Sequence, residues 1–552
     1  MSETREFERT PVEPERLEPA RHFAASYAGE HVAGTEFVIG ALFVSWGVST
    51  GDILWGLLWG NLLAVLTWGL VCAPIAVQTR LTLYAYLEKI AGPGMIKLYS
   101  VVNGILFSIL AGTMITVSAS AVRILFGIPP QVHWYPTSVA FVLVALVVGA
   151  VVVSIAVRGF RGVAQFAQVC APWMVLMFVV GAIAMLPVLY AHTPGANSAG
   201  FFGGLADVAN THIWHSNANG LGFWHVAAFA WICNLAMHGG LSDMTLLRFA
   251  RKSGYGYFSA CGMFIGHYLA WICAGVMGAG AALLVKSSIS RLDAGEVAYQ
   301  ALGSAGIIAV IIAGWTTSNP TIYRAGLAFQ SLSHRWNRVT VTVIAGVVTT
   351  VIACFPFVFT RLMEFVGIMG LVLTPVGAVI VTEHWLFPRL GLTRYWTKYS
   401  GRSINLAVVI AWGLSLLFAF VLQRFGLHLF FLLIPTWIAA TVIYILLASL
   451  MGAREAFTGQ VAQEESAESE RRIREQLYLK QQTYCRLKRH ASVKQWLAGI
   501  VALLSLCACF LLAVMVLEDG APAIFRNWLV LPSIVYFISA TVWVIEKEKR
   551  GV

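Results

Sequence analysis

The chain carries few charged residues: Asp, Glu, Lys and Arg make up only 11% of its 552 residues, whereas 58% are hydrophobic. A soluble globular protein carries roughly 25% charged residues. This shortage argues against a soluble enzyme, a disordered chain and a nucleic-acid-binding module. Hydrophobic runs of about 20 residues recur along almost the whole length, and each can cross a bilayer as a helix. Runs such as 139–153 do not alternate apolar with polar residues as barrel strands do, so an all-α polytopic membrane protein is predicted.

Sequence motifs of several enzyme and channel classes are also missing. The sequence contains no H-E-x-x-H pair, no Walker phosphate loop and no K⁺-channel filter. Its nine cysteines include no Cys-x-x-Cys pair, which is typical of small hydrophobic residues in packed helices. Residues 1–33 contain no apolar stretch of the kind found in a cleavable signal peptide. We therefore predict no enzymatic activity, no catalytic residue and no cofactor beyond a coupling ion, which leaves a secondary transporter.

Fourteen membrane helices are expected from the apolar runs. They are placed at 34–50, 53–77, 98–126, 136–157, 164–190, 223–246, 257–285, 302–323, 339–357, 362–387, 403–423, 427–451, 495–517 and 527–545. An even number puts both termini on one side of the membrane. On this topology 31 of the 37 Lys and Arg residues lie on the side of the termini, so that side is the cytoplasm by the positive-inside rule. The inner (cytoplasmic) membrane is the expected location, and the bilayer and a small solute are the expected partners.

The expected domains follow from these spans. They are a cytoplasmic N-terminal tail at 1–33, a first five-helix repeat at 34–190, an extracytoplasmic loop at 191–222, a second, inverted repeat at 223–387, peripheral helices at 403–451, a charged cytoplasmic linker at 452–494, and additional helices with a tail at 495–552. The first unit has an odd number of helices, so the second begins from the opposite side of the membrane. Transporters built in this way bind their solute where matching helices are interrupted.

Two expected spans combine glycine and small polar residues with a following Asp. The first contains Trp46, Ser49 and Thr50 before Asp52, and the second contains Asn234 and His238 before Asp243. Unwound backbone at such positions exposes carbonyl groups to a cation and N–H groups to a solute. Ordinary glycine packing between helices would explain the glycines equally well at either position taken alone. The two matching positions favour a binding site.

The densest polar cluster lies in the span 302–323. Thr316, Asn319 and Tyr323 share one helical face. Pro320 cannot donate to the carbonyl of Thr316, which leaves that oxygen free beside the hydroxyls of Thr316 and Thr317. Such oxygens suit a small cation, so a Na⁺ site is predicted here, although threonines also bond within their own helix.

Aromatic and ionisable groups inside the spans complete the candidate set. Trp46 and Trp231 could stack on a flat ligand, and Asn234 could bind its polar edge. Membrane-buried ionisable groups are functional candidates by default. They are Glu36, Asp52, His238, Asp243, His267 and Glu364. His238, beside the second interruption, is the candidate for a proton group or a solute contact.

These residues resemble the nucleobase:cation symporter-1 family, which includes purine and cytosine permeases and hydantoin and allantoin transporters. The string W-T-T-S-N-P-T-I-Y-R-A-G-L-A at 315–328 is similar to the cytosine-permease pattern of W-T-T, a polar residue, then Y-x-A-G-L-A. The segments at 373–385 and 241–249 and the Gly-Asn-Leu at 60–62 also resemble family motifs. The resemblance covers roughly residues 34–450. It implies a five-plus-five inverted-repeat core, alternating access and Na⁺ or H⁺ coupling.

The resemblance also implies site residues. Cation ligands would be Thr316 and Thr317 together with the carbonyls of Val44 and Gly47. Solute residues would come from the two interruptions, from Asn319, and from Ser108 and Thr113 in the span 98–126. The expected activity is cation-coupled symport of a small planar nitrogen-rich solute. Two alternatives remain: a symporter of an amine or amino-acid-like solute on the same fold, and a transporter-like sensor that signals through 452–494.

Overall fold

The computed structural model describes residues 7–131, 133–196, 200–217, 220–333, 335–356, 361–486, 492–519 and 522–549. Within these ranges the chain is helical, apart from one isolated bridge between Glu18 and Ala250. Eleven helical segments are long and apolar enough to cross a membrane, and three shorter apolar helices accompany them. The expected all-α membrane architecture is confirmed, whereas the number of spans stays a prediction.

The first half of the core contains helices that are frequently interrupted. They are α1 (Ala20–His31), α2 (Glu36–Ser45), α3 (Thr50–Thr67), the π-helical η2 (Trp68–Cys72), α4 (Ala73–Thr79), α5 (Leu83–Leu125), α6 (Val139–Ala156) and α7 (Gly159–Ala191). We refer to α1 and α2 together as helix 1. The expected span 98–126 begins earlier than predicted, because α5 extends back to Leu83 across a kink at Gly92, whose φ is 84°.

The second half repeats this pattern. It contains α8 (Gly200–Val208), α9 (Phe223–Ile232), α10 (Leu235–His238), α11 (Met244–Leu247), the π-helical η6 (Cys261–Ala270), α12 (Trp271–Val285), α13 (Ala294–Leu302), α14 (Ser304–Gln330), α15 (Arg338–Ala353), α17 (Leu362–Val381), the π-helical η8 (Thr382–Leu386), α18 (Phe387–Leu390) and α19 (Trp396–Tyr399). We refer to α9, α10 and α11 together as helix 6.

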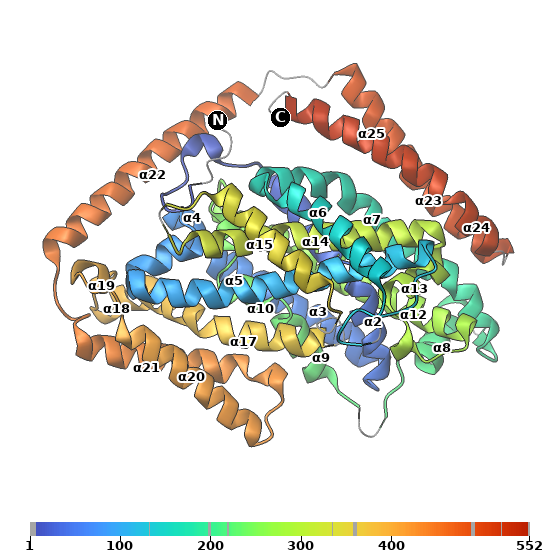
Figure 1. Ribbon diagram of the computed structural model, residues 1–552, viewed down its shortest axis with the longest axis horizontal. Coiled ribbons are helices and arrows are strands. Elements are labelled where there is room, and N and C mark those ends of the chain that lie inside the picture. Colours follow the sequence, from blue (N-terminus) through green and yellow to red (C-terminus); the bar gives the residue numbers. More distant parts are fainter. Residues whose placement is uncertain are drawn as a thin grey trace.

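The pairing of the long helices agrees with an inverted repeat. α2 packs along α12, and α3 packs along α9. The first element of each half therefore pairs with the second element of the other half. α5 and α14, the third element of each half, lie side by side in the middle of the molecule (Figure 1). A pseudo-two-fold axis between the halves produces this reciprocal pattern.

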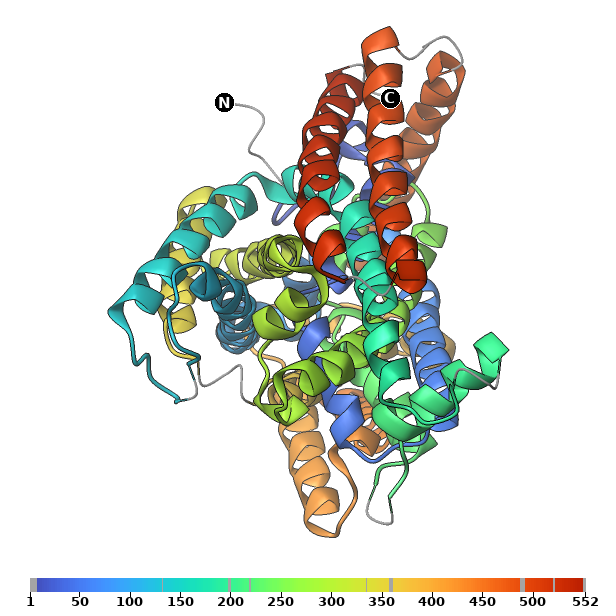
Figure 2. The same cartoon turned by 90° about the vertical axis from the view of Figure 1, so that its right-hand side faces the viewer.

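The remaining helices surround the core. They are α20 (Leu406–Arg424), α21 (Leu433–Met451), α22 (Thr458–Arg486), α23 (Val493–Asp519), α24 (Pro522–Trp528) and α25 (Val530–Lys549). Figures 1 and 2 show α22 along one edge and α23 to α25 at another. The latter pack on α7, where Trp173 Nε1 donates to Ser533 Oγ at 2.9 Å.

Both ends of the described chain meet on one side. Arg21, in the first turn of α1, donates to Glu548 near the end of α25 at 3.0 Å. This contact agrees with an even number of crossings between the two helices.

The start of the first span was predicted wrongly. Residues 1–33 were expected to form a tail, but α1 occupies Ala20–His31 and buries polar side chains, among them His22 and Ser26. The interruption of helix 1 therefore lies at 32–35 and not at 45–52. The segment around Trp46 is instead the turn that joins α2 to α3.

Candidate functional site

The interruption of helix 1 lies in the centre of the core. Gly34 permits it, because a Cβ at this position would lie 2.7 Å from Val117 Cγ1 of α5 and 3.3 Å from the carbonyl oxygen of Val310 of α14. The chain therefore passes between two helices where no side chain fits. The interruption exposes the C-terminal end of α1, which carries Glu30 and His31. This end faces α14 on one side, and helix 6 and η6 on the other.

Oxygen atoms of α1 and α14 meet at this point. Thr317 Oγ1 lies 2.8 Å from the carbonyl oxygen of Glu30 and 3.1 Å from that of Ala313, and Thr316 Oγ1 donates to the same Ala313 oxygen at 3.0 Å. Two hydroxyls and two carbonyls therefore form a compact set of hard ligands, the kind that Na⁺ prefers. The carbonyl oxygen of Glu30 belongs to the end of α1, and that of Ala313 belongs to α14, the helix that contains Pro320. The donor set fits a small cation.

A buried ion triad lies beside the oxygen set. The guanidinium of Arg324, on α14, donates to both carboxylate oxygens of Glu30 at 2.5 and 3.0 Å, and to Asp243 Oδ1 at 2.6 and 3.1 Å. Tyr27 and Trp68 Nε1 donate to the other Asp243 oxygen, at 3.1 and 2.6 Å. All three charged side chains are at most 3% exposed. The triad ties α1 and helix 6 to α14.

Two π-helical segments carry aromatic rings to the end of α1. The ring of His31 lies 5.8 Å from that of Trp68 in η2 and 5.1 Å from that of His267 in η6. Trp68 also lies 4.8 Å from the ring of His238, whose Nε2 donates to the carbonyl oxygen of Trp231 at 2.9 Å. π-Helical turns are rare and frequently occur at functional sites.

Several predicted site residues lie in this centre or have unpartnered polar groups on the helices around it. Thr316, Thr317, Asn234 and His238 lie in the contacts described above or directly beside them, since Asn234 Nδ2 donates to His267 Nε2 at 3.4 Å. Asn319 on α14 and Ser108 on α5 are buried, and their side-chain polar atoms have no hydrogen-bond partner among the described residues.

Other predicted residues lie elsewhere. Ser49 caps the N-terminus of α3, and Thr50 donates to Asn210 at 2.7 Å, so both belong to the turn after α2. Thr113 bonds only within its own helix, to the carbonyl oxygen of Ile109. Trp46 packs its ring against Phe43, at 4.7 Å between ring centroids.

The predicted backbone cation ligands lie outside the contacts between α1 and α14 described above. Val44 and Gly47 were assigned to an unwound segment, but Val44 lies in the last turns of α2. The carbonyl oxygen of Gly47 accepts a hydrogen bond from the amide of Asn217 at 3.2 Å. The backbone oxygen that the hydroxyl of Thr317 contacts on α1 is that of Glu30.

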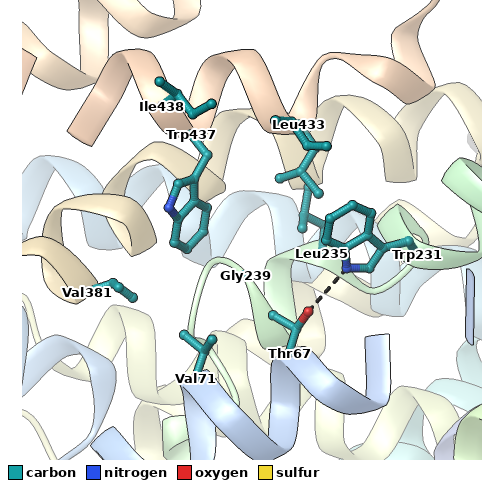
Figure 3. A pocket seen from close by; sticks show the side chains of 10 residues that line it. Thr67, Val71, Trp231, Leu235, Gly239, Val381, Leu433, Trp437 and Ile438 are labelled. Atoms are coloured by element: carbon teal, nitrogen blue, oxygen red, sulfur yellow. Dashed lines mark hydrogen bonds between the residues drawn. The ribbon is translucent and has the colours of Figure 1, made fainter. Parts of the chain in front are cut away.

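Trp231 lies in a different environment from the one predicted. Its Nε1 donates to Thr67 Oγ1 at 3.2 Å, and the ring lines an apolar groove of about 320 Å³ between α3, helix 6 and α21 (Figure 3). Trp437 lies across the same groove. Neither Thr67 nor any residue lining this groove belongs to the oxygen set.

Sequence reasoning missed Glu30, His31 and Arg324. Glu30 and His31 fell within the expected tail, and Arg324 was assigned to the cytoplasmic end of its span. A signal was present, because Arg324 lies one residue beyond the motif's Tyr323 and within a continuous helical pattern. An arginine in such a place requires a carboxylate partner.

Comparisons with known proteins agree with this architecture. No protein-family model and no curated protein matches the sequence. Among solved structures, the chain resembles Mhp1, a nucleobase-cation-symport-1 family transporter, in a closed conformation with bromovinylhydantoin bound. The TM-score is 0.63 at 16% identity, over 84% of this chain and 98% of that chain. The inward-facing conformation of Mhp1 gives a TM-score of 0.58 at 15% identity, over 80% and 93%.

A third solved structure belongs to a Na⁺-coupled sialic acid symporter in a substrate-bound, outward-open state. Its TM-score is 0.55 at 12% identity, over 79% of this chain and 91% of that chain. The chain therefore has the fold of these membrane transporters, and the resemblance noted in the sequence is confirmed at the level of the fold. These neighbours are transporters and not enzymes.

Proposed function

We propose that the chain is a secondary active transporter that couples the entry of Na⁺ to that of a small planar nitrogen-rich solute, such as a nucleobase or hydantoin. The observation that carries the proposal is the oxygen set between α1 and α14. It joins an interrupted helix to a continuous one, and alternating access requires a site at such a junction. Thr316, Thr317 and the carbonyl oxygens of Glu30 and Ala313 would hold the cation.

A buried amide group supports a solute site on the same elements. The amide of Asn319 is fully buried, and neither its nitrogen nor its oxygen has a partner in the described part of the chain. An unsatisfied buried amide costs about 1–3 kcal/mol, which a bound polar solute would offset. Asn319 follows Thr316 by one helical turn, so the solute and the cation would bind near each other. The fold neighbour Mhp1 was solved with bromovinylhydantoin bound, which supports the planar solute class.

Alternating access would follow from the ion triad. Arg324 of α14 binds both Glu30 of α1 and Asp243 of helix 6, so the triad joins these three elements in the present structure. Breaking the triad would separate α1 from α14 and release the cation. We place both termini in the cytoplasm, in the inner membrane, on the distribution of Lys and Arg. The two repeats would occupy 20–191 and 223–390, with α20 to α25 around them.

A thermal-stability screen of the purified protein tests the proposal. The probes are nucleobases, hydantoins, amino acids and amines, each in Na⁺ and in choline. A ligand that binds the folded state raises its melting temperature by mass action. We expect a shift with a nucleobase or hydantoin that requires Na⁺ and is lost in the variant Thr316→Ala/Thr317→Ala.

The matched control is Thr350→Ala, which removes a buried hydroxyl of α15 that bonds only to the carbonyl oxygen of Gly346. This variant is expected to keep the Na⁺-dependent shift. A Na⁺-dependent shift with only an amine or amino acid would overturn the solute class. No shift with any probe in either salt would contradict the proposal and favour the sensor that signals through 452–494.

A further inference from the structure

A second group of polar side chains lies on the other side of the interruption of helix 1. Glu36 is in the first turn of α2 and is 3% exposed. Its side chain contacts residues of η6 and α12. Its carboxylate accepts a hydrogen bond from Trp271 Nε1 of α12, and its Oε1 lies 3.7 Å from His267 Nε2 of η6. The oxygen set on α14 involves neither residue.

The carboxyl group of Glu36 has no cationic partner among the described residues other than a histidine, which is charged only when protonated. An isolated carboxylate in a membrane interior is strongly unfavourable, so such a group binds a proton or a cation. Glu36 and its neighbours Trp271 and His267 are each at most 3% exposed, so the position is tightly packed. A proton is the cation that this packed position can accept.

His267 is arranged to exchange that proton. His267 Nε2, the ring nitrogen nearest to Glu36, also lies 3.4 Å from Asn234 Nδ2, so it has a polar neighbour on each side. The opposite nitrogen, Nδ1, is buried without a hydrogen-bond partner in the described chain. The ring stacks on Trp271 at 4.1 Å, which fixes its orientation toward the carboxyl group. A rearrangement of less than an ångström would bring Oε1 and Nε2 within hydrogen-bond distance.

The surroundings contain further titratable groups but no free positive charge among the described residues. Those facing the pair are His31 of α1, Cys233 in the interruption of helix 6 and, beyond His31, Tyr27 and the triad of Glu30, Arg324 and Asp243. Arg324 is already bound by two carboxylates, so it does not neutralise Glu36. Chains of acidic and histidine side chains inside a membrane commonly serve as proton relays.

We propose that Glu36, with His267, is a proton-binding site, and that the proton is a second coupling ion beside the cation on α14. With one proton the pair is neutral, as a carboxylic acid and an imidazole or as a carboxylate and an imidazolium. Without it the pair carries one buried negative charge, which becomes tolerable only when the interruption opens to water. The proton is therefore released only when the interruption of helix 1 becomes accessible to water.

This inference rests on the proposed symport, but its test does not require the transported solute. We would record infrared difference spectra of the purified protein in lipid nanodiscs, without solute, while the pH is changed from acidic to alkaline. The wild-type protein is expected to lose the carbonyl stretch of a protonated carboxyl group as the pH rises. In Glu36→Gln the part of this band that Glu36 contributes should be absent, although the amide oxygen of the new side chain still accepts from Trp271 and preserves the packing.

His267→Gln should keep the band but shift the midpoint of its loss, because the proton acceptor is gone while a polar side chain remains. The matched control, Glu364→Gln, removes an exposed carboxylate that pairs with Arg361 and should leave the band unchanged. Persistence of the full band in Glu36→Gln, or no titrating band in the wild-type protein, would overturn the proposal. A negative solute screen with a positive infrared result would contradict the proposed symport and leave the proton site standing.

Discussion

Replacing Arg324 by Gln tests the ion triad that joins α1 and helix 6 to α14. The guanidinium makes four N–O contacts of 2.5 to 3.1 Å with Glu30 and Asp243. The substitution would leave two carboxylates buried without a counter-charge. Removing one partner of a buried ion pair typically costs about 3–5 kcal/mol, and here two carboxylates lose the same partner, so the upper part of that range is expected.

The expected loss in the free energy of unfolding differs among three variants of the triad. Glu30→Gln should cost less than Arg324→Gln, about 1.5–3 kcal/mol, because Arg324 keeps its pair with Asp243 and only charge-assisted hydrogen bonds are lost. The triple variant Glu30→Gln/Asp243→Asn/Arg324→Gln should recover most of the loss, since it removes every uncompensated charge. The assay is equilibrium unfolding in mixed micelles, followed by tryptophan fluorescence, which gives the free energy of unfolding.

The control is Arg361→Gln, the same substitution in an exposed pair with Glu364. Such pairs contribute about 0–1 kcal/mol, so little change is expected. The reasoning would be refuted if Arg324→Gln lost no more stability than Arg361→Gln, or if the triple variant were less stable than Arg324→Gln.

Three further predictions concern residues outside the triad. Burial alone would raise the pKa of the Glu464 carboxyl on α22, but hydrogen bonds from Lys398 and Lys89 outweigh it and hold that pKa below its usual range. The stabilisation is therefore present above the ordinary pKa of a glutamate and is lost as the pH falls through the lowered value. The protection of α22 against hydrogen exchange, corrected for the intrinsic pH dependence of the exchange rate, should fall on acidification, and Glu464→Gln should abolish most of this pH dependence. Trp231→Phe should leave the Na⁺-dependent stability shift within about twofold in apparent Na⁺ affinity, because its indole bonds to Thr67 and not to α14; a loss as large as that of the threonine variant would contradict this placement. Deleting the chain after residue 451 should preserve Na⁺-dependent binding, since no residue of the oxygen set lies beyond it; complete loss of binding in a folded, truncated protein would show that this reasoning is wrong.

The polar face of α14 was predictable because its information is local. Thr316, Thr317 and Asn319 lie within one turn of each other, and the effect of Pro320 on the backbone follows from its ring. The structure adds the partner of that face, the carbonyl oxygen of Glu30, which is 287 residues away in the sequence. Neither periodicity nor spacing connects residues so distant.

The first half of helix 1 was missed for a different reason. α1 is short and buries polar and charged side chains, so its hydropathy is that of a surface segment. Its burial depends on partners from α7, η6 and α14. Helix 1 starts at Ala20 and is interrupted at 32–35, whereas the expected interruption was at 45–52. Val44, Gly47, Ser49 and Thr50, which were predicted from that expected interruption, therefore lie at the other end of α2.

Trp231 shows the limit of arguments from residue type. An indole inside an apolar span suits stacking on a flat solute and packing equally well, and only the neighbouring helices decide between them. Here Thr67 of α3 accepts its N–H and Trp437 of α21 lies opposite, so the ring faces the periphery (Figure 3).

The central claim is that this chain moves a solute together with a cation bound between α1 and α14. The most direct measurement is uptake of radiolabelled nucleobases and hydantoins into proteoliposomes under an inward Na⁺ gradient, compared with choline. The account predicts accumulation of at least one such solute above its external concentration, dependent on Na⁺ and reduced at least tenfold in Thr316→Ala/Thr317→Ala but not in Thr350→Ala. Accumulation that is equal in choline, or that survives in the double threonine variant, would contradict it.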